Sequence, residues 1–187
     1  VETFTIEKEK HQMLSRKGAQ KKFYSGLANH SKQCTKYHTA THLFHAACIR
    51  ILGPDATQKG SNITEERMRF DFVHFGKVTQ EQIKELENLV NAAIVRDYLV
   101  SFEIMTTDEA KATGAIGLFE KSYNERVKVY TIGDPNESAV ADPLSSTFSR
   151  EFCGGPHVEH TGELGHFKII KEESVSAGVR RIKAVLE

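Results

Sequence analysis

Two short motifs far apart in the chain carry four side chains that bind transition metals well. The first motif is His38-Thr39-Ala40-Thr41-His42, in a segment whose apolar residues recur at three- and four-residue intervals from Tyr37 to Leu52. This periodicity predicts a helix. Histidines four positions apart lie on the same face of a helix, so both imidazoles can reach one ion.

The second motif is Cys-Gly-Gly-Pro-His at residues 153–157. Glycine permits backbone angles that other residues avoid and proline fixes one angle, so the segment is a shaped turn that can direct Cys153 and His157 to one point. Together with His38 and His42 they would complete a tetrahedral zinc site, and the chain would have to fold so that both motifs meet. Without a metal, Cys153 would be a small buried residue and His157 a loop residue.

The remaining periodicities predict an α+β domain, an antiparallel-rich sheet with helices packed on one face. Potential capping boxes stand at the pairs Thr79/Gln82 and Thr106/Glu109, each followed by a helical segment. A loop rich in Pro, Asp, Asn and Ser is predicted for residues 133–149. Strands are predicted at residues 68–75, 100–104, 127–129, 167–170 and 179–186.

The chain of 187 residues is long enough for one domain with a core. We expect a charged linker or helical arm at residues 1–36, either solvated or in contact with RNA, and the metal-binding domain at residues 37–187. The formal net charge is zero, so phosphate binding would need local basic patches. Three widely spaced cysteines and the lack of a membrane-spanning or signal segment favour a reduced, cytoplasmic setting. The start at Val1 suggests a piece of a longer protein, or removal of a start residue.

Five motifs, in order, resemble the editing domain of alanyl-tRNA synthetases. They are HTATHLFH at residues 38–45, QKGS at 58–61, RFDF at 69–72, CGGPH at 153–157 and GVRRI at 178–182. The likeness runs from about Tyr37 to the end of the chain. The related editing domain of threonyl-tRNA synthetases and the free-standing AlaX editing proteins share only the two metal motifs closely.

The resemblance implies a fold of the threonyl/alanyl-tRNA synthetase editing-domain type, and proofreading hydrolysis of Ser-tRNA(Ala) and Gly-tRNA(Ala). It implies zinc at His38, His42, Cys153 and His157. Gln58 matches a pocket position of the family, and Thr41 could contact the aminoacyl group. The implied partners are the acceptor end of mischarged alanine tRNA and the rest of an ATP-binding alanine–tRNA ligase. The family usually has Thr where this chain has Pro156.

Several further residues are candidates for the chemistry. Glu151 is either a general base or a surface glutamate, and His45 is either a pocket residue or a partly buried histidine. Thr39 and Ser61 join Thr41 and Gln58 as possible partners of a serine hydroxyl. Basic side chains that could contact tRNA phosphates are Arg69, Lys168, Lys171, Arg180, Arg181 and Lys183.

Three functions fit these motifs. The first is an editing esterase within the synthetase, the second is a free-standing trans-editing protein of the AlaX type, and the third is a zinc-structured tRNA-binding module without hydrolytic activity. A site with four protein ligands is typical of structural zinc, whereas catalytic zinc usually keeps an open position. Zinc could therefore act on the ester or only order the pocket.

Overall fold

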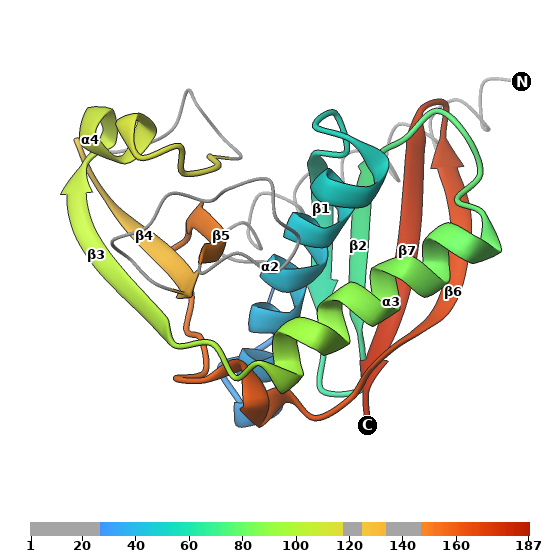
Figure 1. The fold of residues 1–187 in the computed structure, drawn as a ribbon, viewed down its shortest axis with the longest axis horizontal. Helices are drawn as coiled ribbons and strands as arrows, with labels where there is room; N and C mark the ends of the chain where they lie inside the picture. The colour runs from blue at the N-terminus through green and yellow to red at the C-terminus, as the bar shows by residue number, and fades with distance from the viewer. Residues whose placement is uncertain (1–26, 118–124, 134–146) are drawn as a thin grey trace, which may run out of the picture.

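The computed structural model describes residues 27–117, 125–133 and 147–187 (Figure 1). Residues 1–26 of the predicted charged arm therefore lie outside the described residues. The first described helix, α2, spans Lys32–Leu52; the Ser31 hydroxyl accepts a hydrogen bond from the Cys34 N–H, and Gly53 ends the helix with a φ of 106°. Helix α2 therefore begins five residues before Tyr37.

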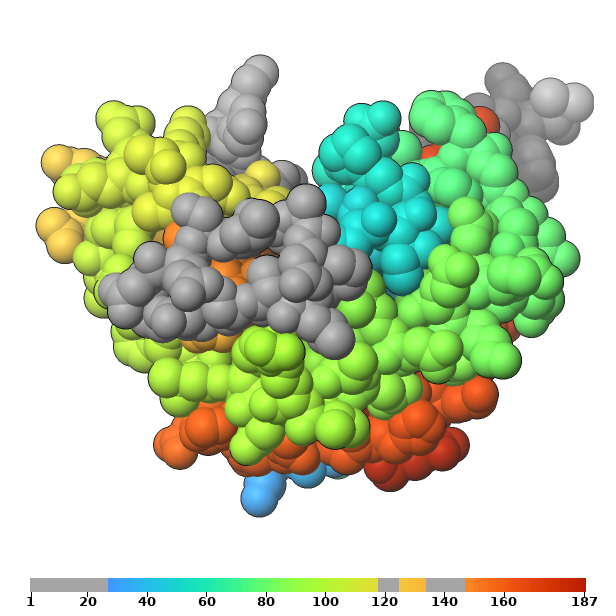
Figure 2. Space-filling view, viewed as in Figure 1, coloured from blue at the N-terminus to red at the C-terminus, as the bar shows by residue number. Residues whose placement is uncertain are grey.

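Four antiparallel strands form the larger sheet, in the order β1-β2-β7-β6. Their bounds are Gln58–Ile63 for β1, Met68–Val73 for β2, Phe167–Ser176 for β6 and Val179–Leu186 for β7. Both α2 and α3 (Gln80–Val95) pack on one face of this sheet (Figure 1). The space-filling view shows the outer side of α3 running across the front of the molecule (Figure 2).

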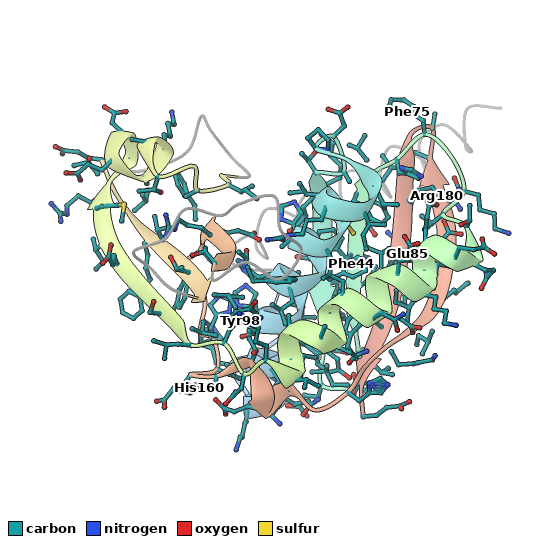
Figure 3. The ribbon with its side chains drawn as sticks, viewed as in Figure 1. Phe44, Phe75, Glu85, Tyr98, His160 and Arg180 are labelled. Carbon is teal, nitrogen blue, oxygen red and sulfur yellow. The ribbon has the colours of Figure 1, made fainter. Side chains whose placement is uncertain are left out.

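The aromatic side chain of Phe44, on α2, is the centre of the packing between helix and sheet. Its ring lies 5.4 Å from Phe70 and 5.8 Å from Phe167, measured between ring centroids, and it is fully buried (Figure 3). Burial of a large apolar side chain contributes about 1.5–3 kcal/mol. This packing fixes which face of α2 meets the sheet. It therefore also fixes how the side chains on the other faces of α2 are oriented.

A second sheet has three antiparallel strands in the order β3-β4-β5. The strands span Val100–Thr106, Arg126–Gly133 and Thr147–Phe152, and the short helix α4 (Thr107–Ala112) packs against β3 and β4. Strand β5 also contacts α2, and the 3-10 helix η1 (Thr161–Leu164) contacts α2 and α3. The long helix α2 therefore lies between the two sheets, with its C-terminal half against β1 and β2.

The predicted α+β class is confirmed, and both predicted capping boxes are present. Two strands were not predicted. Strand β1 is polar and lies at a sheet edge, and β5 begins within the predicted loop because its alternate residues are polar and buried at the site described below. In the described part of the chain, no helix has both the length and the apolar character needed to cross a membrane.

Candidate metal centre

The two predicted ligand pairs meet between α2 and the turn that follows β5. Donor atoms of His38, His42, Cys153 and His157 all lie within 4.8 Å of one another. The Cys153 Sγ lies 3.4 Å from His38 Nε2 and 3.5 Å from His157 Nε2. The rings of His38 and His157 stack with their centroids 4.2 Å apart. The structure thus brings together the four predicted metal ligands.

Backbone and side-chain contacts hold the ligand turn against α2. The Cys153 N–H donates to the carbonyl of Lys128 at 3.1 Å, which extends the pairing of β5 with β4. Near the other end of β5, the Arg50 guanidinium donates to the Phe148 carbonyl at 2.6 Å. The strand is therefore tied on both sides before the chain turns at Gly154.

Each histidine of the cluster has an oxygen partner for its second ring nitrogen. His38 Nδ1 lies 2.9 Å from the Pro156 carbonyl oxygen, His42 Nδ1 lies 3.2 Å from Glu151 Oε2, and His157 Nδ1 lies 3.1 Å from Thr39 Oγ1. With the ring proton on Nδ1, each histidine donates to its oxygen and presents an unprotonated Nε2 to a metal. At Pro156 only the carbonyl is used, so proline keeps the group that His38 needs.

The Thr39 hydroxyl joins the helix to the ligand turn. It accepts the Val158 N–H at 3.2 Å, lies against His157 Nδ1, and is within 3.4 Å of the Thr35 carbonyl to which it can donate. One donor and two acceptor positions are all that a hydroxyl offers. Thr39 is fully engaged as an orienting group.

Glu151 is a buried partner of histidines and not a surface glutamate. Its side chain is 3 % exposed, Oε1 accepts from the Ser149 hydroxyl at 2.8 Å, and Oε2 lies 3.2 Å from the Nδ1 atoms of both His42 and His45. Burial by itself raises the pKa of Glu151, but the charges of His42 and His45 lower it well below its usual range. Both oxygens of Glu151 therefore have partners, and Oε2 orients the rings of His42 and His45.

The charges of Cys153 and His157 suit metal binding, whereas His42 must lose a proton to bind a metal. Burial lowers the pKa of His42, but the charges of Glu151 and Cys153 outweigh this and raise the pKa well above its usual value. Burial raises the pKa of the Cys153 thiol, but the charge of His42 and hydrogen bonds from His157 and His38 outweigh this and lower the pKa to about 2. Burial lowers the pKa of His157 to about 3. A thiolate and a neutral imidazole are the forms that coordinate zinc.

His45 adds a further turn to the histidine face of α2. Its ring is fully buried against Phe70, with centroids 5.6 Å apart, and its Nδ1 contacts Glu151. Among the described residues its Nε2 has no hydrogen-bond partner. His45 therefore supports the cluster through Glu151 and is not one of the four grouped ligands.

The other predicted pocket residues differ in their contacts. The Thr41 hydroxyl donates to the Tyr37 carbonyl at 2.8 Å and lies 3.7 Å from Met68 Sδ, in the core between α2 and β2. Gln58 opens β1 and Ser61 lies within it. In the described part of the structure, the side chains of Gln58 and Ser61 make no hydrogen bond.

The predicted basic patch is largely paired with carboxylates. The Arg181 guanidinium makes two hydrogen bonds to Asp71, at 2.7 and 2.8 Å. Lys171 and Lys183 both pair with Glu173. Arg180 and Lys168 pair with Glu172 and Glu87 respectively. These side chains stabilise the strands of the larger sheet and do not form a uniform positive surface.

An open hollow of about 520 Å³ lies beside His157. The other residues that line it come from the start of α2 and from the segment after the ligand turn: His30, Lys32, Thr35, Val158, Glu159 and Glu163. Solvent can approach the ligand turn through this hollow.

Sequence reasoning missed the roles of Thr39 and Glu151 as partners of the ligand rings. A signal for Glu151 was present, because it stands two positions before Cys153 on an extended segment, and alternate residues of a strand share one face. For Thr39 no local signal exists, because its partners His157 and Val158 are distant in sequence.

The part of the chain that holds the cysteine of the cluster matches a known family of domains. Residues 127–183 match the family described as threonyl and alanyl tRNA synthetase second additional domain. This match covers the ligands Cys153 and His157, while His38 and His42 precede it.

Several relatives of the chain are alanine–tRNA ligases. The chain is 54% identical over 179 residues to the alanine–tRNA ligase of Treponema denticola, a match that covers 96% of this chain and 28% of the relative. It is 50% identical over 177 residues to the ligase of Treponema pallidum, covering 95% of this chain and 27% of the relative. The ligase of Pseudoalteromonas translucida is 46% identical over 150 residues, a match that covers 80% of this chain and 16% of the relative.

The chain is therefore an editing-related domain of the alanyl-tRNA synthetase type, as its motifs predicted. It spans about a quarter of the length of the Treponema ligases that it matches.

Proposed function

We propose that this chain is the editing domain of an alanyl-tRNA synthetase. It hydrolyses the ester that joins serine or glycine to alanine tRNA, with Zn²⁺ held by His38, His42, Cys153 and His157. One observation carries the proposal: four donor atoms within 4.8 Å of one another belong to histidines whose second nitrogens each face an oxygen, and to a cysteine whose pKa is lowered.

The donor set fits zinc. Three imidazoles and a thiolate are nitrogen and sulfur ligands that zinc accepts in tetrahedral sites, and their partners orient them before any ion binds. A zinc ion bound there would supply a Lewis acid beside the ester carbonyl and the amino group of the substrate. Thr39 and Glu151 hold His157 and His42 in position, so we assign them positioning roles.

Selectivity for serine requires a polar partner for its hydroxyl, because alanine lacks only that group. Four side chains were candidates on the sequence. The hydroxyls of Thr39 and Thr41 already have partners within α2 and the ligand turn. Gln58 and Ser61 have none among the described side chains, so we propose that Gln58, with Ser61 beside it, recognises the serine hydroxyl.

A second function, a zinc-structured tRNA-binding module without hydrolytic activity, draws support from the closed set of four ligands. Similarity to a segment of longer ligases supports action within a synthetase and not as a free-standing trans-editing protein. We accordingly propose that the chain works with the rest of the ligase, in the cytoplasm, on the acceptor end of the tRNA.

The test is deacylation of Ser-tRNA(Ala), Gly-tRNA(Ala) and correctly charged Ala-tRNA(Ala) by the purified chain. We expect hydrolysis of the first two and sparing of the third. Cys153→Ala should abolish hydrolysis, and Cys34→Ala, which removes another buried thiol outside the cluster, should retain it. A chain that binds tRNA and zinc but leaves all three esters intact would favour the structural module.

A further inference from the structure

One face of the smaller sheet carries a row of side chains from the metal cluster to the edge strand β3. Glu151 is paired with Tyr130 on β4, and Tyr130 is paired with Phe102 on β3. Directly paired residues of antiparallel strands share a face of the sheet. The row therefore starts at the carboxylate that holds His42 and ends at Phe102.

Ring contacts make this row continuous. The Tyr130 ring lies 4.2 Å from the His157 ring and 5.3 Å from the Phe102 ring, measured between centroids. Tyr130 is buried, whereas Phe102 is 49 % exposed. Ile104, two positions further along β3 on the same face, is 58 % exposed. An aromatic ring thus stands half in solvent, two ring contacts from a predicted metal ligand.

A cation completes this surface. The Lys128 ammonium lies 3.6 Å from the centroid of the Phe102 ring and 3.0 Å from the Tyr130 hydroxyl. Among the described residues no carboxylate pairs with Lys128. In this part of the chain Lys128 thus differs from Arg181 and Lys183 on the larger sheet, which pair with carboxylates.

We propose that Phe102 and Lys128 form the binding surface for the terminal nucleoside of the tRNA acceptor end, with its base stacked on the exposed side of the Phe102 ring. This inference deepens the proposed function and rests on it. Aromatic rings stack on bases and nearby basic side chains meet phosphates in sites for single-stranded nucleic acid. The aminoacyl ester is attached to the ribose of that nucleoside, so a base on Phe102 leaves the ester directed along the row to His157.

Fluorescence provides a direct test, because the chain contains no tryptophan. Phe102→Trp places an indole at the proposed stacking position. Phe75→Trp is the matched control: Phe75 is 91 % exposed, lies in the loop that follows β2, and contacts the β6–β7 turn beside Gly178 (Figure 3). The probe is an uncharged RNA hairpin that ends in single-stranded CCA, compared with the same hairpin without its last adenosine.

We expect the CCA hairpin to quench the Phe102→Trp emission in a saturable manner, the truncated hairpin to quench it much less, and the Phe75→Trp emission to stay unchanged. Phe102→Ala should weaken hairpin binding roughly 5- to 150-fold, the range for loss of one stacked base. Absence of quenching, equal quenching of both tryptophans, or equal quenching by both hairpins would overturn the proposal.

The quenching experiment tests this inference separately from the proposed function, because the hairpin carries no aminoacyl ester. Quenching by the CCA end in a chain without deacylase activity leaves this inference standing and removes the editing function. Deacylation without quenching removes this inference alone. If Phe102→Ala instead weakens association with the remainder of the synthetase and leaves hairpin binding unchanged, the exposed ring is a protein contact and the nucleoside assignment is wrong.

Discussion

His42 and Glu151 form a buried contact, with His42 Nδ1 3.2 Å from Glu151 Oε2, although they come from different elements of the chain. A carboxylate that receives the Nδ1 proton of a ligating histidine fixes both the ring orientation and the tautomer. Glu151 thereby connects β5 to the metal cluster twice, through His42 and through its neighbour Cys153 two positions later. Four predictions test this organisation.

Glu151→Gln should weaken zinc binding by 10- to 100-fold, the range for loss of such an outer partner. The amide keeps the shape of the side chain but removes the charge that favours His42. Affinity can be measured by competition with a chromophoric chelator. Glu109→Gln, at the start of α4 and outside the cluster, is the control and should bind zinc like the parent chain. Equal affinity of Glu151→Gln and the parent would refute this role.

Zinc should stabilise the parent chain and not the Cys153→Ala variant. An ion that binds only the folded state adds stability in proportion to the logarithm of its concentration over its dissociation constant, about 2.7 kcal/mol at a hundredfold excess. We therefore expect the thermal midpoint of the parent to rise with added zinc and to fall again with a chelator. Cys34→Ala should respond like the parent, and an unresponsive parent chain would contradict the metal site.

Thr39→Val should reduce stability by about 1–3 kcal/mol, because the buried Val158 N–H and His157 ring lose their shared acceptor. Thr39→Ser should restore most of the loss, since it keeps the hydroxyl. Thr41→Val is the matched comparison, because it removes a hydroxyl that serves only its own helix and Met68. Chemical denaturation measures the free energy of unfolding of the three variants. We expect Thr39→Val to lose more stability than Thr41→Val. The reverse order would count against the role of Thr39.

Phe44→Ala should destabilise the domain by about 3–5 kcal/mol, because it opens a cavity where α2 meets the larger sheet. Phe75→Ala removes a ring of the same kind that is 91 % exposed and should change stability by no more than about 0.5 kcal/mol. Urea denaturation followed by circular dichroism compares the two. Similar losses would mean that Phe44 is not central to the core.

Local rules predicted the parts of the fold that depend on neighbours in sequence. The periodicity of α2, both capping boxes and the alternation of β2, β3 and β7 could be read directly, because a helix repeats every 3.6 residues and a strand every two. Strands β1 and β5 could not, since one is a polar edge strand and the other carries buried polar residues at the site. Strand β1 pairs with β2, which follows it closely in the chain, so its polar composition and not distance hides it, whereas β5 pairs with β4 across residues 134–146.

The sequence by itself determined which side chains could bind a metal ion. Spacing placed His38 and His42 on one helical face, and the CGGPH turn supplied Cys153 and His157, because the residues of each pair stand only four positions apart. Only the tertiary structure decided that the two pairs meet, that Thr39 and Glu151 hold the rings, and that the predicted basic patch is paired with acids. Those contacts join residues brought together by the packing of α2 against β5 and by strand register, and no local pattern records such distances.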